Sequence, residues 1–300
     1  MFAKRSSIFG KPVCALLCLV AALGATPVHA SDDAIKTAAI AVNGTELYYR
    51  EAGDGAPVIF LHAFLLNSHL WLDQLGGLSD FCRCIAVDLR GFGQSAPYTA
   101  TYLDPYVYAE DIVAFIEAQD FDQPVHLVGM SVGGFIAGLV YDKAPEKVAS
   151  ITLISALFDW EPDPAYARYQ QAMARLAVVE GKGAVFRRFD EYIDGPAASL
   201  HTRARYKSML EDTRTEMMVA LLSNGGATRP RPDLYDKITV PVLLPVGTDD
   251  TVVSVERANA IGSKFINAQV VQIEDAGRLL SLENAEALND ALRAFWRDID

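Results

Sequence analysis

The chain is short of basic residues, of cysteine and of long apolar runs. It has 26 lysines and arginines against 38 aspartates and glutamates, which gives a net charge of −12 with histidine neutral. Such an acidic chain is a poor partner for nucleic acid, because phosphates bind cationic surfaces. Hydrophobic residues make up 51% of its 300 residues. That content suits a large buried core and excludes a disordered protein.

The apolar run at residues 13–24 is too short to cross a membrane. It contains about a dozen residues, whereas a spanning helix needs roughly 20. It follows a basic segment and precedes "VHA", an A-x-A-like site that ends before Ser31. This pattern predicts a signal peptide at residues 1–30 and export to the periplasm or the exterior, with a membrane anchor as the alternative. The basic residues are Lys4, Arg5 and Lys11.

Cysteine usage implies neither a disulfide framework nor a metal site. In the leader, lipid attachment at Cys18 is disfavoured by the bulky Leu17 before it. Cys82 and Cys84 stand two residues apart at the start of an expected strand, so both point to one face and are expected to be buried as small hydrophobes. The sequence also has no phosphate loop or dinucleotide fingerprint, so no cofactor and no metal are implied.

Short apolar runs rich in β-branched residues alternate with helical patterns. A hairpin comes first, because Asn43-Gly44 separates two strand-like segments and both residues tolerate positive φ. Helices are predicted at 104–120, after Ser131 and at 283–298. The alternation predicts an α/β fold with a mostly parallel sheet whose strands are buried on both faces. These strands are expected at 57–62, 84–89, 125–129, 148–155, 240–247 and 268–274.

Residues 156–236 interrupt this alternation. They contain helical patterns at 165–180 and 200–223, no convincing strand, and turn-rich segments at both ends. We therefore expect a helical lid or cap inserted into a core made of residues 31–155 and 237–300.

Gly129-Met130-Ser131-Val132-Gly133 stands between an expected strand and an expected helix, which is the context in which G-x-S-x-G forms a nucleophile elbow. The tight turn strains the serine and needs small neighbours, which the glycines supply. The N-terminus of the following helix would offer free N–H groups to a developing oxyanion. A structural glycine-rich turn is the alternative.

These motifs resemble the α/β-hydrolase family, and the resemblance extends over nearly all of the chain after the leader. "VIFLHAFLLNSHLWLDQL" is similar to the family's His-Gly oxyanion loop, and "AVDLRGFGQSA" to its next loop. The resemblance implies an eight-stranded-type sheet with helices on both faces and a helical cap. It also implies an oxyanion hole formed by the N–H groups of Phe64 and Val132. Ala63 stands where the family has glycine, so a methyl group would crowd this hole.

The family order of serine, acid and histidine places the acid after a late strand. In "LLPVGTDDTV" the family's G-x-x-D arrangement maps the acid onto Asp250, with Asp249 as the alternative. Its role would be to orient a histidine and to stabilise the imidazolium.

Arg278 occupies the position of that histidine. Similar members follow the last strand with D-A-G-H, whereas this chain has Asp275-Ala276-Gly277-Arg278. Arginine stays protonated and has no acceptor lone pair, so Arg278 cannot take a proton from Ser131. What it can do is pair with Asp250.

The other histidines after the leader do not obviously replace the base. His62 matches a structural residue of the family beneath the oxyanion loop, and His69 is expected on a surface helix. His126 precedes Ser131 on the same strand by five residues, roughly 15 Å. His201 could serve only if the lid carried it into the site.

The sequence therefore predicts an exported serine hydrolase of the 3-oxoadipate enol-lactonase-like or esterase-like group, acting on the ester or lactone carbonyl of a small molecule. Its activity should be impaired, because loss of a triad residue can cost about 10⁶ in kcat. The alternative is an inactive pseudo-hydrolase in which a salt bridge between Asp250 and Arg278 turns the site into a receptor for an anionic or carbonyl-bearing ligand. A third hypothesis, a cofactor-free haloperoxidase-like enzyme, is weakened by the same arginine.

Overall fold

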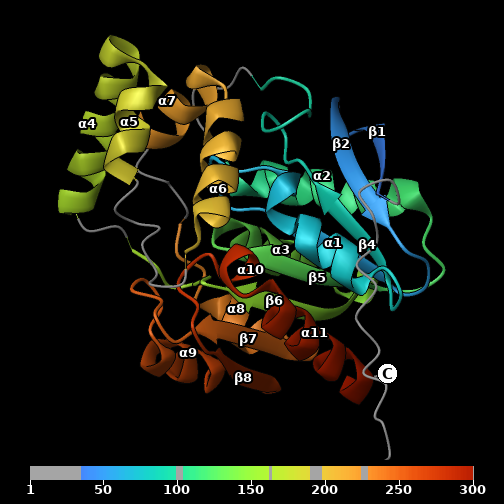
Figure 1. Ribbon diagram of the computed structural model, residues 1–300. Coiled ribbons are helices and arrows are strands. Elements are labelled where there is room, and N and C mark those ends of the chain that lie inside the picture. The colour runs from blue at the N-terminus through green and yellow to red at the C-terminus, as the bar shows by residue number, and fades with distance from the viewer. Residues whose placement is uncertain (1–34, 99–103, 162–163, 190–197, 224–228, 300) are drawn as a thin grey trace, which may run out of the picture.

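The computed structural model describes residues 35–98, 104–161, 164–189, 198–223 and 229–299, so the expected leader at 1–30 lies outside them. Figure 1 shows an eight-stranded sheet in the order β1-β2-β4-β3-β5-β6-β7-β8. Strands β3 to β8 run parallel to one another. Strand β1 pairs antiparallel with β2, and β2 pairs antiparallel with β4. The predicted α/β fold with a mostly parallel sheet is confirmed. The strands are β1 (Lys36–Val42), β2 (Thr45–Ala52), β3 (Pro57–Leu61), β4 (Arg83–Val87), β5 (Val125–Met130), β6 (Val148–Ile154), β7 (Val242–Gly247) and β8 (Ala268–Ile273).

The first two strands form the predicted hairpin. Asn43 and Gly44 have φ angles of 44° and 68°, and the flanking residues Val42 and Thr45 pair with each other. A two-residue turn with positive φ at both positions matches the twist of the strands that it joins.

Burial depends on the position of a strand in the sheet. Strands β3, β5 and β7 are buried at every residue, as expected for strands covered on both faces. Strand β8 is only partly buried, so the prediction of two-sided burial is wrong for it. Strand β8 is the last strand of the sheet, and its apolar composition does not reveal this edge position.

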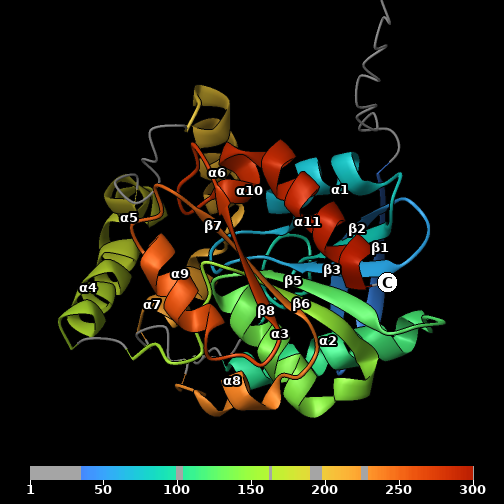
Figure 2. The ribbon, with the colours of Figure 1, turned by 90° about the horizontal axis from the view of Figure 1, so that it is seen from below.

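Helices cover both faces of the sheet (Figures 1 and 2). On one face lie α1 (Leu72–Leu78), α10 (Leu280–Glu283) and α11 (Ala285–Ile299), and on the other lie α2 (Pro105–Gln119), α3 (Val132–Lys143) and α8 (Asp233–Lys237). Helix α9 (Val255–Gly262) packs against β7 and β8. The described part of the core also contains the 3₁₀ turns η2 (Ser68–Trp71) and η3 (Pro145–Lys147). Among the described residues, no helix is both long and apolar enough to cross a membrane.

Four further helices between β6 and β7 gather at one side of the molecule (Figure 1): α4 (Pro164–Glu180), α5 (Lys182–Phe189), α6 (Leu200–Asp212) and α7 (Thr215–Ser223). We call this group the lid. The helical pattern at 200–223 does not form one helix, because Thr213 is extended, with φ −63° and ψ 127°. The chain therefore turns between α6 and α7.

Candidate active site

Ser131 stands in a strained turn between β5 and α3. Its φ of 53° and ψ of −119° are unusual for a residue with a side chain. Its N–H donates to the carbonyl of Ile154 at the end of β6, at 2.8 Å. The serine is half-buried. Strained backbone of this kind concentrates at functional sites, where the surrounding structure holds it.

The glycines on either side of Ser131 are required by close contacts. A Cβ on Gly129 would lie 2.4 Å from the carbonyl oxygen of Gly133, and a Cβ on Gly133 would lie 2.2 Å from that of Leu61. Helix α3 can therefore begin directly against β3 and β5 only when both positions lack a side chain. This contact places Ser131 beside the loop that follows β3.

The two expected oxyanion-hole residues lie at that junction. Val132 is the first residue of α3, so its N–H has no partner within the helix. Phe64 stands in the loop after β3. No hydrogen bond from the N–H of Phe64 or Val132 is recorded among the described residues. Within the described residues both N–H groups are thus unpaired, and both lie where an oxyanion would be held.

Asp250 rather than Asp249 is built into the fold. Asp250 is 5% exposed, and its Oδ1 accepts the N–H groups of Val252 and Val253 at 2.8 and 3.0 Å. Asp249 is exposed. A buried carboxylate with several donors is fixed in orientation, as an acid that supports a catalytic base must be.

Ser155 is a site residue that the sequence did not reveal. It directly follows β6, is buried, and has a positive φ of 46°. Its Oγ donates to Oδ2 of Asp250. The pairing of Met130 with Ile154 places Ser155 next to Ser131 across the two strands. No local motif marks this serine, because its partner is 95 residues away.

Arg278 faces Ser131 and not Asp250. The guanidinium is half-buried, and its Nη2 donates to Oγ of Ser131 at 3.3 Å. Within the described chain no ion pair joins Arg278 to Asp250, so the salt bridge of the pseudo-hydrolase alternative is not formed. Asp250 instead accepts from Ser155 and from two backbone N–H groups.

Glu283 holds the backbone on both sides of Arg278. Its Oε2 accepts the N–H of Gly277 at 2.7 Å, and its Oε1 accepts that of Leu279 at 3.1 Å. Burial raises the pKa of Glu283, and the two N–H donors partly oppose this rise. The sequence shows that Glu283 follows Arg278 by five residues. The hydrogen bonds from Gly277 and Leu279 to its carboxylate, however, depend on the turn of the chain between Arg278 and Glu283.

His62 has a structural role beneath the oxyanion loop. It is fully buried, and burial lowers its pKa. Its Nε2 accepts the N–H of Leu89 at 2.9 Å, which assigns the ring proton to Nδ1, and Nδ1 donates to the carbonyl of Ala63 at 2.8 Å. Both nitrogens are engaged with the backbone, so His62 has no free lone pair for Ser131.

The remaining histidines of the described chain lie in other surroundings. His126 bonds Ser150 at 2.7 Å within the sheet. His69 receives a hydrogen bond from Arg50 at 2.8 Å, and burial lowers its pKa. His201 is exposed on α6. Ser150 and Arg50 are thus hydrogen-bond partners of His126 and His69.

Cys82 and Cys84 are buried free thiols with their Sγ atoms 3.2 Å apart. Burial raises the pKa of the Cys84 thiol above that of an ordinary thiol. Within the described ranges no group of three or more histidine, cysteine or acidic side chains is arranged to hold a metal ion.

Comparison with known proteins assigns the family. The family model for the alpha/beta hydrolase fold matches residues 56–185. A non-heme chloroperoxidase from Streptomyces lividans is 31% identical over 276 residues, which cover 84% of this chain and 96% of that protein. The chain therefore belongs to the α/β-hydrolase family, as its motifs predicted.

Solved structures share the fold over most of the chain. An esterase from Thermogutta terrifontis has a TM-score of 0.81 and 24% identity, and the match covers 88% of this chain and 99% of that one. An esterase from Rhodococcus sp. ECU1013 has a TM-score of 0.73 and 25% identity, with coverage of 89% and 100%.

Proposed function

We propose that this chain is an exported serine hydrolase that attacks the carbonyl of a small ester or lactone with Ser131, and that Arg278 limits its turnover. The strained turn at Ser131, with φ 53°, is the observation that carries the proposal, because this geometry presents a nucleophile at a helix N-terminus. The similar esterase from Rhodococcus supports an ester substrate. Export rests on the sequence of residues 1–30.

In this proposal Oγ of Ser131 attacks the carbonyl carbon, and the N–H groups of Phe64 and Val132 stabilise the resulting oxyanion. The proton of Ser131 must leave during the attack. Arg278 can stabilise negative charge on Oγ, but it cannot accept this proton. The proton therefore passes to solvent, and turnover is slow compared with that of an enzyme with a complete triad.

The test combines a fluorophosphonate probe with hydrolysis of p-nitrophenyl acetate. The mature protein, Ser131→Ala and Arg278→His are compared, with Arg278→Lys as the control that keeps the charge. We expect weak labelling and slow hydrolysis that both require Ser131, and a gain of about 100-fold or more in Arg278→His.

Three outcomes separate the possibilities. Hydrolysis in Arg278→His alone would make the natural chain a disabled hydrolase. No Ser131-dependent reaction in any variant would contradict the hydrolase assignment. A gain in Arg278→Lys equal to that in Arg278→His would show that the imidazole is not the missing group.

A second candidate is a pseudo-hydrolase that binds a small carboxylate. It is favoured by the guanidinium of Arg278, which points at Ser131 and has no acidic partner in the described chain. A guanidinium fork suits a carboxylate, and the hydroxyl of Ser131 could donate to the same ligand.

A further inference from the structure

The oxyanion loop contains a strained turn. The N–H of Leu66 donates to the carbonyl of Ala63 at 3.2 Å, so residues 63–66 form a β-turn with Phe64 and Leu65 at its centre. Leu65 has a φ of 67°, at the position where such turns favour glycine. A leucine in this conformation persists only where other contacts hold it.

One of these contacts comes from the lid. Oγ1 of Thr213 donates to the carbonyl of Leu65 at 2.7 Å. Thr213 is 2% exposed and Leu65 is 7% exposed, so water does not compete freely for this bond. Thr213 is also the extended residue that separates α6 from α7. The break in the predicted helix and the strained turn therefore meet at one hydrogen bond.

The residues beside Thr213 are anchored in the same region. Nδ2 of Asn67, just after the turn, donates to Asp212 at 3.3 Å. Arg214 donates to the carbonyls of Gly91 and Ser95 at 2.7 and 3.2 Å. We call residues 212–214 the lid corner. Its three consecutive residues bind the two loops that follow β3 and β4.

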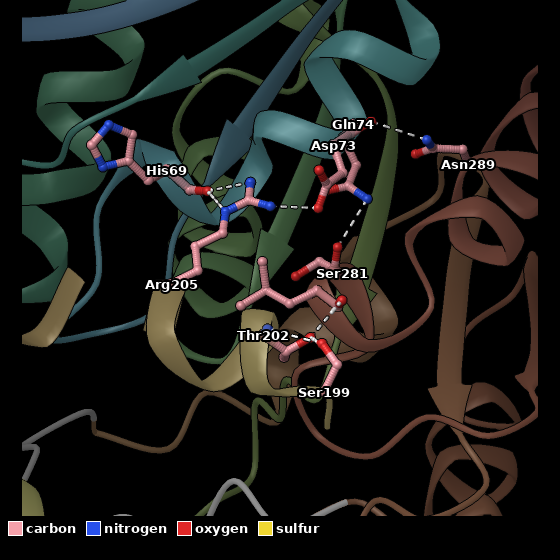
Figure 3. A network of polar contacts seen from close by, with 9 residues as sticks. His69, Asp73, Gln74, Ser199, Thr202, Arg205, Ser281 and Asn289 are labelled. Atoms are coloured by element: carbon pink, nitrogen blue, oxygen red, sulfur yellow. Dashed lines mark hydrogen bonds and ion pairs between the residues drawn. The ribbon is translucent and has the colours of Figure 1, made fainter. Parts of the chain in front are cut away.

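Helix α6 also binds the core at places away from the turn formed by residues 63–66 (Figure 3). Arg205 donates to the carbonyl of His69 and to Asp73, at 2.8 and 2.6 Å, and Oγ1 of Thr202 donates to the carbonyl of Leu282 at 3.4 Å. Thr202 is 5% exposed. It is thus a second buried threonine that joins α6 to the core, and although its hydrogen bond is longer than that of Thr213, its similar burial makes it a control for Thr213.

We propose that Thr213 is a positioning residue for the oxyanion hole: its hydroxyl holds Leu65 in the left-handed conformation and thereby orients the N–H of Phe64 toward the substrate oxygen. The hole is then complete only while the lid corner is seated on the loop. This inference rests on the proposed function, because it assigns the N–H of Phe64 to an oxyanion bound at Ser131.

Phenylboronic acid tests the hole without requiring turnover. Oγ of Ser131 forms a bond to boron, the serine proton leaves to solvent, and the tetrahedral adduct carries the negative charge that the oxyanion hole would stabilise. Affinity is measured by calorimetry for the wild type, Thr213→Val, Thr213→Ser and Thr202→Val, with Ser131→Ala as the control for adduct formation.

We expect Thr213→Val to weaken boronate binding about three- to ten-fold, as for the loss of one hydrogen bond. Thr213→Ser keeps the hydroxyl and should stay within about two-fold of the wild type. Thr202→Val should leave the affinity unchanged, and thermal denaturation of both variants shows how far each substitution lowers stability. Equal affinities of Thr213→Val and Thr202→Val would overturn the proposal.

Amide hydrogen exchange separates this proposal from the proposed function. Thr213→Val should speed exchange in residues 62–70, and Thr202→Val should not. Unchanged exchange there would refute the coupling even if the chain is a hydrolase. If exchange responds but the wild type binds boronate no better than Ser131→Ala does, then the proposed function fails and the oxyanion role of Thr213 fails with it.

Discussion

Nη2 of Arg278 lies 3.3 Å from Oγ of Ser131 and donates a hydrogen bond to it. A permanent positive charge thus stands where a hydrolase needs a proton acceptor. The charge lowers the energy of an alkoxide on Ser131, but the guanidinium has no lone pair to receive the proton. Electrostatic stabilisation and proton transfer, which one histidine can provide together, are separated in this site.

The first prediction is that wild-type hydrolysis depends on hydroxide. In the proposed mechanism the proton of Ser131 passes to solvent, so kcat/KM for p-nitrophenyl acetate should rise about ten-fold per pH unit across the neutral range. In Arg278→His the imidazole accepts the proton, so the pH profile of kcat/KM should level off above the imidazole pKa of about 6.5. Rates measured from about pH 5.5 to 9 check both slopes. A wild-type plateau near neutral pH would reveal a base that the structure does not show.

The second prediction concerns the binding of a carboxylate. Benzoate should bind the wild type and lose about ten-fold or more in affinity in Arg278→Met, because a charge-assisted hydrogen bond contributes roughly 1.5–3 kcal/mol. Arg278→Lys should retain part of the affinity, since it keeps the charge but not the fork. Calorimetry at low ionic strength measures the difference. Equal affinity in all three proteins would refute the second candidate function.

The third prediction uses two glycines with different surroundings. Gly133→Ala should destabilise the protein by about 3 kcal/mol or more, because its Cβ would stand 2.2 Å from the carbonyl oxygen of Leu61. Gly183 lies in α5, and the nearest atom to its Cβ would be Nη1 of Arg187 at 3.9 Å. Gly183→Ala should therefore be neutral or stabilise by about 0.5–1 kcal/mol. Urea denaturation compares them, and similar losses in both would contradict the close-contact explanation.

The sequence predicted those parts of the site that depend on neighbours along the chain. The turn at Asn43-Gly44 and the glycines around Ser131 are local requirements of backbone geometry, so their positions are visible in the residue types. The preference for Asp250 came from the spacing of a family motif, and its catalytic role stays a prediction, while the structure shows that Asp250 is buried.

Long-range contacts decided what the sequence did not predict. The hydroxyls of Ser155 and Thr213 find partners 95 and 148 residues away, and nothing near either residue marks these bonds. The orientation of Arg278 is also a long-range matter, because its guanidinium donates to Ser131, 147 residues away. Helical propensity continues through Thr213, and a tertiary hydrogen bond overrides it.

The fourth prediction compares the two neighbouring acids. Asp250→Ala should cost about 3 kcal/mol, because it leaves the buried hydroxyl of Ser155, the buried N–H of Val253 and the partly buried N–H of Val252 without their acceptor. Asp250→Asn should cost only about 1 kcal/mol, since the Ser155 hydroxyl can reverse its direction and accept from the amide. Asp249→Ala should lie within about 0.5 kcal/mol of the wild type, as for an exposed residue. Chemical denaturation measures all three, and equal costs for the two alanine variants would remove the structural distinction between Asp249 and Asp250.

The fifth prediction concerns the pH dependence that Glu283 gives to stability. Burial raises its pKa in the folded protein above the ordinary 4.5. Between these two pKa values the folded state holds more protons than the unfolded state, so the free energy of unfolding falls as the pH rises through this interval. Glu283→Gln has no proton to exchange and should lack this fall. Its amide offers one acceptor oxygen to the N–H groups of Gly277 and Leu279, so at pH 7 it should be less stable than the wild type by about 1–2 kcal/mol.

Urea denaturation from about pH 4 to 7 should therefore show the wild type losing part of its advantage over Glu283→Gln as the pH rises. An advantage that grows with pH would mean that the two N–H donors outweigh burial and hold the pKa of Glu283 below its ordinary value.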